Sequence, residues 1–410
     1  MLNRVWSFLI LAAVASGLYG VWTGQGDILD GVAKALIDMA GLSVEIAIGL
    51  IGVMSLWLGL FELASRVGLV DRLARLLSPL FARLMPTVPT GHPALGSVSA
   101  NLAANMLGLD NAATPLGIRA MQDLETLNNQ PGTITSAQSL FLVLNTSSVT
   151  LIPVTVLMYR AVQGSASPAA VFLPIVIATC LSTFAGLLAF GLATRSFKVD
   201  RVLALWAVGF CLLVGGLVLC AMQMEPEALS HWSTTVGNSV ILLFVASVVL
   251  MALWQKLNGF EIFVQGAQQG FQVALTIIPY LIALLCAIGM FRASGLMDAL
   301  VDGLRFVVSG FGWDSRWVDA LPTGLMKPLS GSGSRALLLE LMEAKGVDSF
   351  AARAAAIMQG STETTFYVIA VYGGAVGIKR FASTVPCALV ADGVAIVAAI
   401  GLSYLFFGVS

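Results

Sequence analysis

Gln359-Gly-Ser-Thr-Glu-Thr-Thr365 is a run of polar residues and glycine around one ionisable side chain, Glu363. It interrupts a segment that is otherwise apolar enough to cross a membrane. Because a carboxyl group and several hydroxyls are costly in the bilayer core, such a cluster usually marks a site. A polar seam that holds neighbouring helices together is the alternative interpretation. The length of the run and its central Glu favour a site.

The composition indicates a membrane protein. Hydrophobic residues fill 58% of the 410 positions and charged residues 10%, and the mean hydropathy is +0.91. Soluble domains carry about 25% charged residues, and long unbroken apolar runs argue against a β-barrel. The fold class that we predict is therefore an all-α polytopic membrane protein.

Several partners and cofactors are excluded at this stage. The net charge is −1 without a basic block, which argues against nucleic acid as a partner. The five cysteines lie in apolar stretches without a C-x-x-C pair, and the two histidines, His92 and His231, are far apart. We therefore expect no metal site and no resident cofactor.

A membrane span needs about twenty apolar residues. By that measure the expected spans are roughly 4–22, 42–65, 136–160, 168–193, 201–223, 233–255, 271–292, 350–376 and 384–408. The first resembles a secretory signal; an uncleaved span is the favoured interpretation and cleavage the alternative. Residues 28–40 and 69–85 are amphipathic and are expected to lie flat at the interface.

The placement of Lys and Arg predicts the orientation, because cytoplasmic loops carry an excess of both. With the N-terminus in the cytoplasm, the basic residues of 66–83, 195–201 and 379–380 fall inside. The acidic loop Met224-Glu-Pro-Glu227 then falls outside. We expect an N-in, C-out topology.

Two regions, 90–122 and 317–345, are too polar and too interrupted to span the membrane. Their centres are Gly108-Leu-Asp-Asn-Ala-Ala-Thr-Pro115 and Lys327-Pro-Leu-Ser-Gly-Ser-Gly-Ser-Arg335. Apolar flanks favour re-entrant hairpins whose tips meet near the membrane middle over loops folded on the surface.

The two halves of the chain repeat. Gly59-Leu-Phe61 and Gly68-Leu-Val-Asp71 find an echo in Gly289-Met-Phe291 and Gly295-Leu-Met-Asp298. Each half continues with an amphipathic segment, a hairpin, a span broken by a polar run, and a closing span; in the first half that run is 145–150. Because the repeat starts at the second and seventh spans, the units should be two inverted repeats, the architecture of secondary transporters.

These motifs carry a resemblance. The first half, with Asn101-Leu-Ala-Ala-Asn-Met-Leu-Gly-Leu-Asp-Asn-Ala-Ala-Thr-Pro-Leu-Gly117 and Leu144-Asn-Thr-Ser-Ser148, resembles the spore maturation protein A family. The second half, with Pro322-Thr-Gly-Leu-Met-Lys-Pro-Leu-Ser-Gly-Ser-Gly-Ser-Arg335 and Gln359-Gly-Ser-Thr-Glu-Thr364, resembles the spore maturation protein B family. The chain looks like a fusion of the two. Expected domains are an N-terminal span (1–27), a first gate-type repeat (28–200), linking spans (201–257) and a second repeat (258–410).

Both families belong to the nucleoside-recognition or gate-domain group, which is similar to parts of concentrative nucleoside transporters and of ferrous-iron transporters. The resemblance implies a bacterial cytoplasmic (inner) membrane protein with a transport-like fold, and it makes a homo-oligomer plausible. No GTP-binding P-loop is found, so the iron-transporter interpretation lacks its motor. In the gate domains Pro often follows Asn-Thr-Ser-Ser, whereas Val149 stands here.

In the nucleoside transporters, hairpin tips and unwound helices bind the substrate and sodium. Carried onto this sequence, the hairpin positions are Asp110, Asn111, Thr114, Ser330, Ser332, Ser334 and Arg335. The broken-helix positions are Asn145, Thr146, Ser147, Ser148, Gln359, Ser361, Thr362 and Glu363.

The charged residues among these leave alternatives open. Lys327 and Arg335 flank the second hairpin centre and would either capture an anionic group or pair with Glu363 or Asp110. Glu363 itself would be either a proton acceptor in coupled transport or a structural ion-pair partner.

Three function classes compete. A secondary transporter for a small polar metabolite, nucleoside-like or carboxylate and coupled to Na⁺ or H⁺, explains the repeated broken spans. An intramembrane enzyme needs a nucleophile–base pair or metal ligands, and the shortage of histidine counts against it. A non-transporting structural or signalling membrane protein is the remaining alternative.

Overall fold

Helices make up nearly all of the protein. The computed structural model describes residues 2–194 and 201–408, except for the side chains of residues 2, 110–112 and 202. Within these ranges there is no strand, and one isolated bridge joins Thr133 and Arg380. The all-α prediction is therefore confirmed.

The first half of the chain forms a series of long and short helices. It contains α1 (Leu2–Trp22), α2 (Asp27–Arg66), α3 (Leu69–Leu84), α4 (Pro93–Met106), α5 (Asp110–Glu125), α6 (Ser136–Ser147), α7 (Val154–Val162), η1 (Pro168–Val171) and α8 (Phe172–Thr194). The middle contains α9 (Arg201–Met222) and α10 (Pro226–Trp254).

The second half repeats the order of the elements from α2 to α8. It contains α11 (Gly259–Ala293), α12 (Leu296–Gly310), η2 (Val318–Ala320), α13 (Leu321–Met326), α14 (Gly331–Lys345), α15 (Phe350–Gly360), α16 (Thr365–Ala375) and α17 (Thr384–Phe407). In both halves a glycine in the left-handed region ends the long first helix and lets the chain turn into the amphipathic second helix: Gly68 (φ 73°) and Gly295 (φ 77°).

Seven helices of the described ranges are long and apolar enough to cross a membrane, namely α1, α2, α8, α9, α10, α11 and α17. They correspond to seven of the predicted spans and show that this is a polytopic membrane protein. The other two predicted spans, 136–160 and 350–376, are each divided into two short helices, α6 with α7 and α15 with α16.

The segment 28–40 was wrongly predicted as a separate interfacial helix. It is the first part of α2, which continues without a break to Arg66. Its amphipathic character comes from Asp30, Lys34 and Asp38, which recur every four residues and form an exposed stripe on one side of this helix. The segment 69–85 does form an amphipathic helix, α3.

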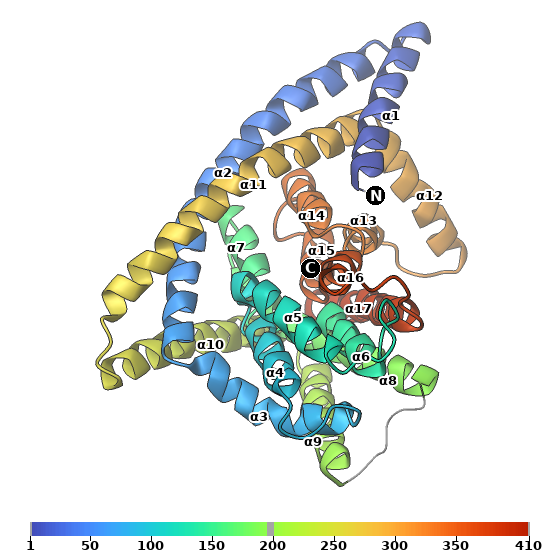
Figure 1. Cartoon of the computed structure of the whole chain (residues 1–410). Coiled ribbons are helices and arrows are strands. Elements are labelled where there is room, and N and C mark those ends of the chain that lie inside the picture. Colours follow the sequence, from blue (N-terminus) through green and yellow to red (C-terminus); the bar gives the residue numbers. More distant parts are fainter. Residues whose placement is uncertain (1, 195–200, 409–410) are drawn as a thin grey trace.

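The long helices α2 and α11 lie side by side along one edge of the molecule (Figure 1). They run antiparallel, because Gly59 of α2 packs on Phe263 near the start of α11, whereas Met39 packs on Gly289 near its end. In an inverted repeat the two leading helices run in opposite directions, so this arrangement is compatible with one. The inversion itself, and the membrane face from which each hairpin would enter, stay predictions.

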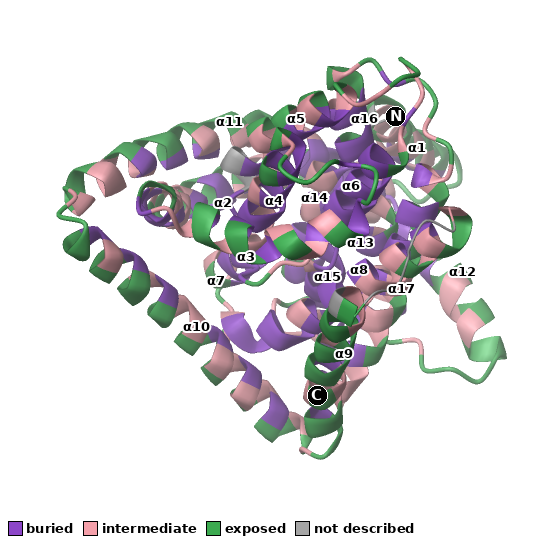
Figure 2. Ribbon diagram, turned by 60° about the horizontal axis from the view of Figure 1, so that its bottom comes forward, coloured by how far each residue is buried: buried purple, intermediate pink, exposed green. Residues whose placement is uncertain are grey.

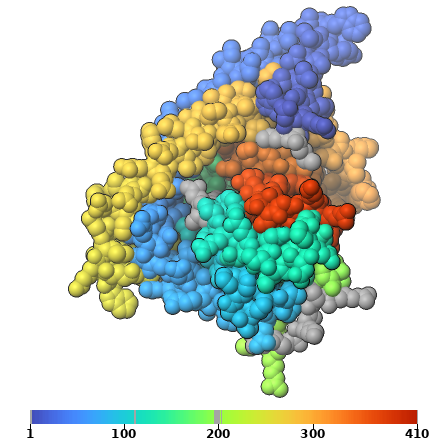
Figure 3. All heavy atoms as spheres, in the orientation of Figure 1, coloured from blue at the N-terminus to red at the C-terminus, as the bar shows by residue number. Residues whose placement is uncertain are grey.

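The short helices form the interior. In Figure 2, α6, α14 and α15 are mostly buried, whereas α9, α10 and α12 show long exposed stretches. Segments from the two halves meet directly: Figure 3 shows the region of α5 and α6 in teal against the red C-terminal region, in agreement with the packing of α5 on α16 and of α6 on α17. The breaks in the helices therefore lie where the two halves touch.

Candidate functional site

The two broken segments run antiparallel and cross at their breaks. Near one end, the rings of Phe141 in α6 and Tyr372 in α16 stack with their centroids 5.9 Å apart. At the breaks, the backbone N–H of Glu363 donates to the carbonyl of Thr146 at 2.9 Å. Beyond them, Arg160 bonds to Asp348. The polar run of one half is thus held directly against that of the other.

The first break is tied to the turn between α4 and α5. Residues 148–153 are not helical, and the N–H of Leu151 donates to the carbonyl of Met106 at 2.8 Å. The side-chain amide of Asn105 donates to Oδ1 of Asn145 at 2.8 Å. These bonds replace helix hydrogen bonds that the break removes, so the unwound backbone is fixed by its neighbours.

The second break is tied in the same manner to the turn between α13 and α14. Residues 361–364 are not helical, and the N–H of Phe366 donates to the carbonyl of Pro328 at 3.0 Å. The Ser334 hydroxyl lies 2.5 Å from Oε1 of Gln359. At the N-terminus of α14, the hydroxyl of Ser330 accepts the N–H of Gly333.

The centres of both predicted hairpins are shorter than expected. Helix α5 restarts at Asp110, so that Pro115 lies within a helix, and α14 starts at Gly331, so that Arg335 is helical. The non-helical turns are 107–109 and 327–330. Capping by Ser330 accounts for the early start of α14.

The breaks and the turns enclose one cavity with about 110 Å³ of space for water-sized molecules. Both halves contribute to its wall, which consists of Asn105, Gly108, Thr150, Ile152, Pro153, Val154, Thr155, Val156, Lys327, Gly331, Arg335, Gln359, Gly360, Thr362, Glu363 and Thr364. Polar and charged side chains are in the majority, which suits a small polar ligand rather than an acyl chain.

The charges of the cavity favour an anionic group. Lys327 and Arg335 both line it, against the single carboxylate of Glu363. Lys327 is buried, whereas Arg335 is half-buried and also donates to the carbonyl of Gly331 at 3.1 Å. Three helices, α7, α14 and α16, begin at the wall, and helix N-termini carry partial positive charge.

The structure brings five of the predicted site residues to the cavity: Lys327, Arg335, Gln359, Thr362 and Glu363. A second group of predicted residues does not line the cavity. These residues lie in the breaks, in the last turn of α6, or in the turn before α14 and its first turn: Asn145, Thr146, Ser147, Ser148, Ser330, Ser332, Ser334 and Ser361. Thr114 lies elsewhere, beside Tyr372 of α16. The side chains of Asp110 and Asn111 are outside the described residues.

Sequence reasoning missed several residues. Asn105, Thr150 and Thr364 line the cavity although only their neighbours were predicted. Asp392, buried in α17, accepts a hydrogen bond from the hydroxyl of Thr365 at 2.7 Å. A lone carboxylate in an apolar span was the sequence feature that could have identified Asp392.

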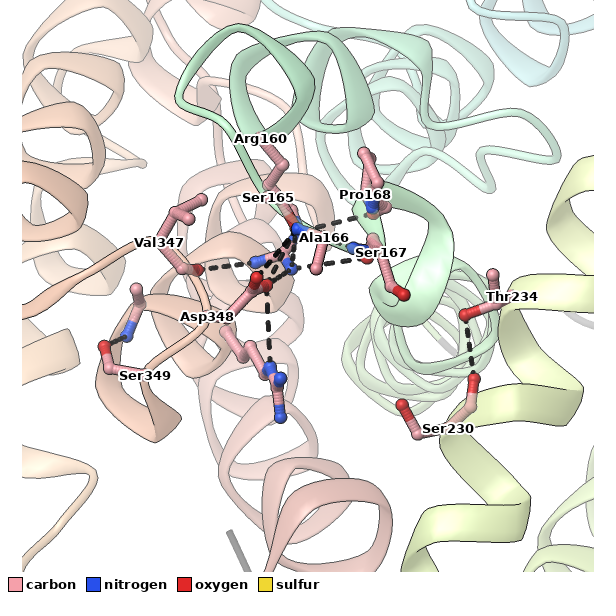
Figure 4. Close-up of polar contacts among 12 residues, drawn as sticks. Arg160, Ser165, Ala166, Ser167, Pro168, Ser230, Thr234, Val347, Asp348 and Ser349 are labelled. Carbon is pink, nitrogen blue, oxygen red and sulfur yellow. Dashed lines mark hydrogen bonds and ion pairs between the residues drawn. The ribbon is translucent and has the colours of Figure 1, made fainter.

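A cluster around Arg160 was also missed. Figure 4 shows Arg160, at the end of α7, pointing toward Asp348 in the loop before α15. The guanidinium is fully buried, lies 2.6 Å from Oδ1 of Asp348, and also donates to the carbonyl oxygens of Val347 (3.0 Å) and Pro168 (3.2 Å). This cluster joins a loop of the first half to a loop of the second.

Asp348 is held in its charged form. Burial alone would raise the pKa of its carboxyl, but hydrogen bonds from the Ser165 hydroxyl and the Ala166 N–H, together with the charge of Arg160, outweigh that effect and lower the pKa below its ordinary value. The ion pair is therefore intact at neutral pH.

Comparison with known proteins identifies the family to which the chain belongs. A family model described as the nucleoside-recognition Gate domain matches residues 47–162 and again 274–379, together just over half of the chain. The chain belongs to this Gate family. The first match ends with α7 and the second just after α16, so each covers a turn between two short helices and a broken segment.

Two curated relatives each match less than half of this chain but nearly all of their own length. Spore maturation protein B of Bacillus subtilis (strain 168) is 38% identical over 170 residues, which are 42% of this chain and 94% of the relative. Spore maturation protein A of the same organism is 36% identical over 182 residues, 44% of this chain and 90% of the relative. These shares agree with a fusion of the two. No solved structure matches the chain.

Proposed function

We propose that this Gate-family protein is a secondary transporter of the bacterial cytoplasmic membrane that moves a small polar metabolite, nucleoside-like or carboxylate, by alternating access. The cavity at the crossing of the two broken segments is its substrate site. The description of the family as nucleoside recognition supports this substrate class.

One observation carries the proposal: a single polar cavity is built from both breaks and from the turns 107–109 and 327–330. A purely structural protein has no need for two unwound segments, since each break removes backbone hydrogen bonds that neighbours must replace. In a transporter, unwound backbone at such a point provides the polar groups that bind the substrate.

The charges suggest how a substrate is held. A carboxylate or another anionic group would face Lys327 and Arg335, and Arg can bind a carboxylate through two parallel hydrogen bonds. The amides of Asn105 and Gln359 offer both a donor and an acceptor to a base or a sugar.

The alternative function is a non-transporting structural or signalling membrane protein. The names of the two relatives refer to spore maturation and to no transported substance. This alternative predicts that no small molecule binds at the cavity, so the same experiment decides between the two.

The test uses the full chain in detergent and then in proteoliposomes. Uridine, adenosine, succinate and citrate are screened for an increase in melting temperature, and compounds that stabilise are assayed for uptake. Lys327→Met and Arg335→Met should each weaken binding about 10- to 100-fold, the range of one charge-assisted hydrogen bond. Lys345→Met, an exposed cation of the same helix as Arg335, is the control and should bind normally. Absence of both stabilisation and uptake for all four compounds would favour the alternative.

A further inference from the structure

One carboxylate lies in the middle of α17, whose other residues are uncharged. Asp392 is 4% exposed and sits eight residues after the start of this membrane-spanning helix. A charge at such a place is costly unless the protein or a ligand compensates it, so intramembrane carboxylates usually serve a function. The central cavity does not use it, since Asp392 is not part of the cavity wall.

The two oxygens of this carboxylate differ in their surroundings. Oδ2 accepts a hydrogen bond from the hydroxyl of Thr365 at 2.7 Å. Oδ1 is buried and has no hydrogen-bond partner among the described residues. A buried carboxylate oxygen without a donor is unfavourable, and a bound cation would remove that cost.

The surroundings of Asp392 provide further oxygen ligands. Thr362 lies in the second break and Thr365 directly follows it; both are buried and lie close to the carboxylate. Helix α15 ends there, at Gly360, and the carbonyls of a helix C-terminus attract cations. Hydroxyl, carboxylate and carbonyl oxygens are the ligands that hard monovalent cations take in unwound transporter helices.

We infer that Asp392, Thr362 and Thr365 form the site of the coupling cation, Na⁺ or H⁺, behind the substrate cavity. This inference deepens the proposed function by locating its coupling ion, and only the role in transport rests on that function. Binding of the cation itself requires no substrate.

Lys327 links this site to the cavity. It lines the cavity and is also near enough to Asp392 for the two charges to interact. A cation or a proton on Asp392 neutralises the negative charge that attracts the ammonium group of Lys327. Lys327 then interacts more strongly with an anionic substrate in the cavity. The substrate must then favour cation binding by the same factor, which is coupling by linkage.

Other charged groups on elements packed against α17 lie elsewhere. Glu363 lines the cavity, and Arg353 of α15 stacks on Phe407 at the far end of α17. On the side of α8, Ser182 donates to the carbonyl of Ala391. Within the described side chains, Lys327 is therefore the charged group that acts on Asp392.

The experiment measures the stability of the full-length protein without any substrate. One arm raises NaCl against choline chloride at constant ionic strength and alkaline pH; the other lowers the pH in the absence of Na⁺. The expected result is a saturable rise in melting temperature in one arm, which identifies the cation. Asp392→Asn should abolish that rise, and Glu363→Gln, which changes the cavity wall but not this site, should keep it.

Two hydroxyl variants keep the test decisive if Asp392→Asn does not fold. Thr365→Val and Thr362→Val should each weaken the cation response about tenfold, as loss of a supporting group does in ion sites. The inference is overturned if the folded wild type responds in neither arm, if Asp392→Asn responds like the wild type, or if only Glu363→Gln loses the response. A normal cation response without any uptake would instead contradict the proposed transport.

Discussion

Removing the Asp348 carboxylate should strongly destabilise the protein, because it leaves the fully buried Arg160 guanidinium without its charge partner. Breaking a buried ion pair from one side costs about 3–5 kcal/mol. Arg160 keeps the carbonyls of Val347 and Pro168 and the hydroxyl of Ser165 as acceptors, so the low end of that range applies. We expect Asp348→Ala to lower the free energy of unfolding by about 3 kcal/mol.

The ion pair of Asp314 and Arg316 is the matched control. Both side chains are more than 40% exposed, so solvent screens this pair. Asp314→Ala should cost about 1 kcal/mol or less. The assay is unfolding by denaturant in detergent, with Arg160→Met and the double variant Arg160→Met/Asp348→Ala completing a cycle. The double variant should be more stable than Asp348→Ala alone, since it buries no uncompensated charge.

The pH dependence follows from the lowered pKa of Asp348. A carboxyl with a lower pKa in the folded state stabilises fully above its unfolded pKa of about 3.9, and this stability is lost as the pH falls through the folded value. The difference between wild type and Asp348→Ala should therefore be constant near neutral pH and shrink only in acid. A cost of Asp348→Ala no larger than that of Asp314→Ala would refute this account of the cluster.

Three further predictions concern close contacts and access to the cavity. Gly117→Ala should reduce stability by about 1–3 kcal/mol in the same unfolding assay, because its Cβ would overlap the ring of Tyr372. Gly331→Ala should reduce ligand binding more than stability, measured by titration and by melting temperature, since its Cβ would lie 2.5 Å from the hydroxyl oxygen of Thr364 at the cavity. Lys327→Cys should react with a hydrophilic thiol reagent and be protected by bound ligand.

Each of these has a control in the structure. Gly374→Ala, in α16, meets no atom within 4 Å and should leave stability and binding unchanged. Leu338→Cys, a fully buried position of α14, should not react with the reagent. Equal effects of the three glycine variants, or labelling of both cysteines at the same rate, would contradict the predicted packing and the predicted access.

The broken segments could be predicted because their cause is local. Runs of hydroxyl, amide and glycine residues weaken an apolar helix wherever they occur, so the sequence around Asn145 and around Gln359 was enough to locate both breaks. Their exact ends were not predictable, because capping by groups such as Ser330 decides the last turn. The continuous helix α2 was not predicted, because a stripe of charged residues occurs both in a separate interfacial helix and at the exposed end of a long span.

The contacts between the halves could not be predicted, because they depend on how distant segments pack. Arg160 was the last residue of an expected span, and its partner Asp348 is far away in the sequence. Asn105 was within a quoted motif, but its bond to Asn145 exists only because the α4–α5 turn lies against the first break. Such contacts between distant residues leave no periodic pattern in the sequence from which they could be predicted.

The positions of Glu363 and Asp392 predict different roles for the two carboxylates in the proposed transport. Glu363 is half-buried in the cavity wall, where it faces any bound ligand, whereas Asp392 lies outside that wall and touches Thr365. A change at Glu363 should therefore alter which ligands bind, and a change at Asp392 should alter how binding depends on the cation. From the sequence, Glu363 was the natural candidate for both tasks, since it lies inside the polar run. The packing of α17 behind the second break supplies a second carboxylate, so in the proposed transport ligand recognition and ion coupling fall on different carboxylates.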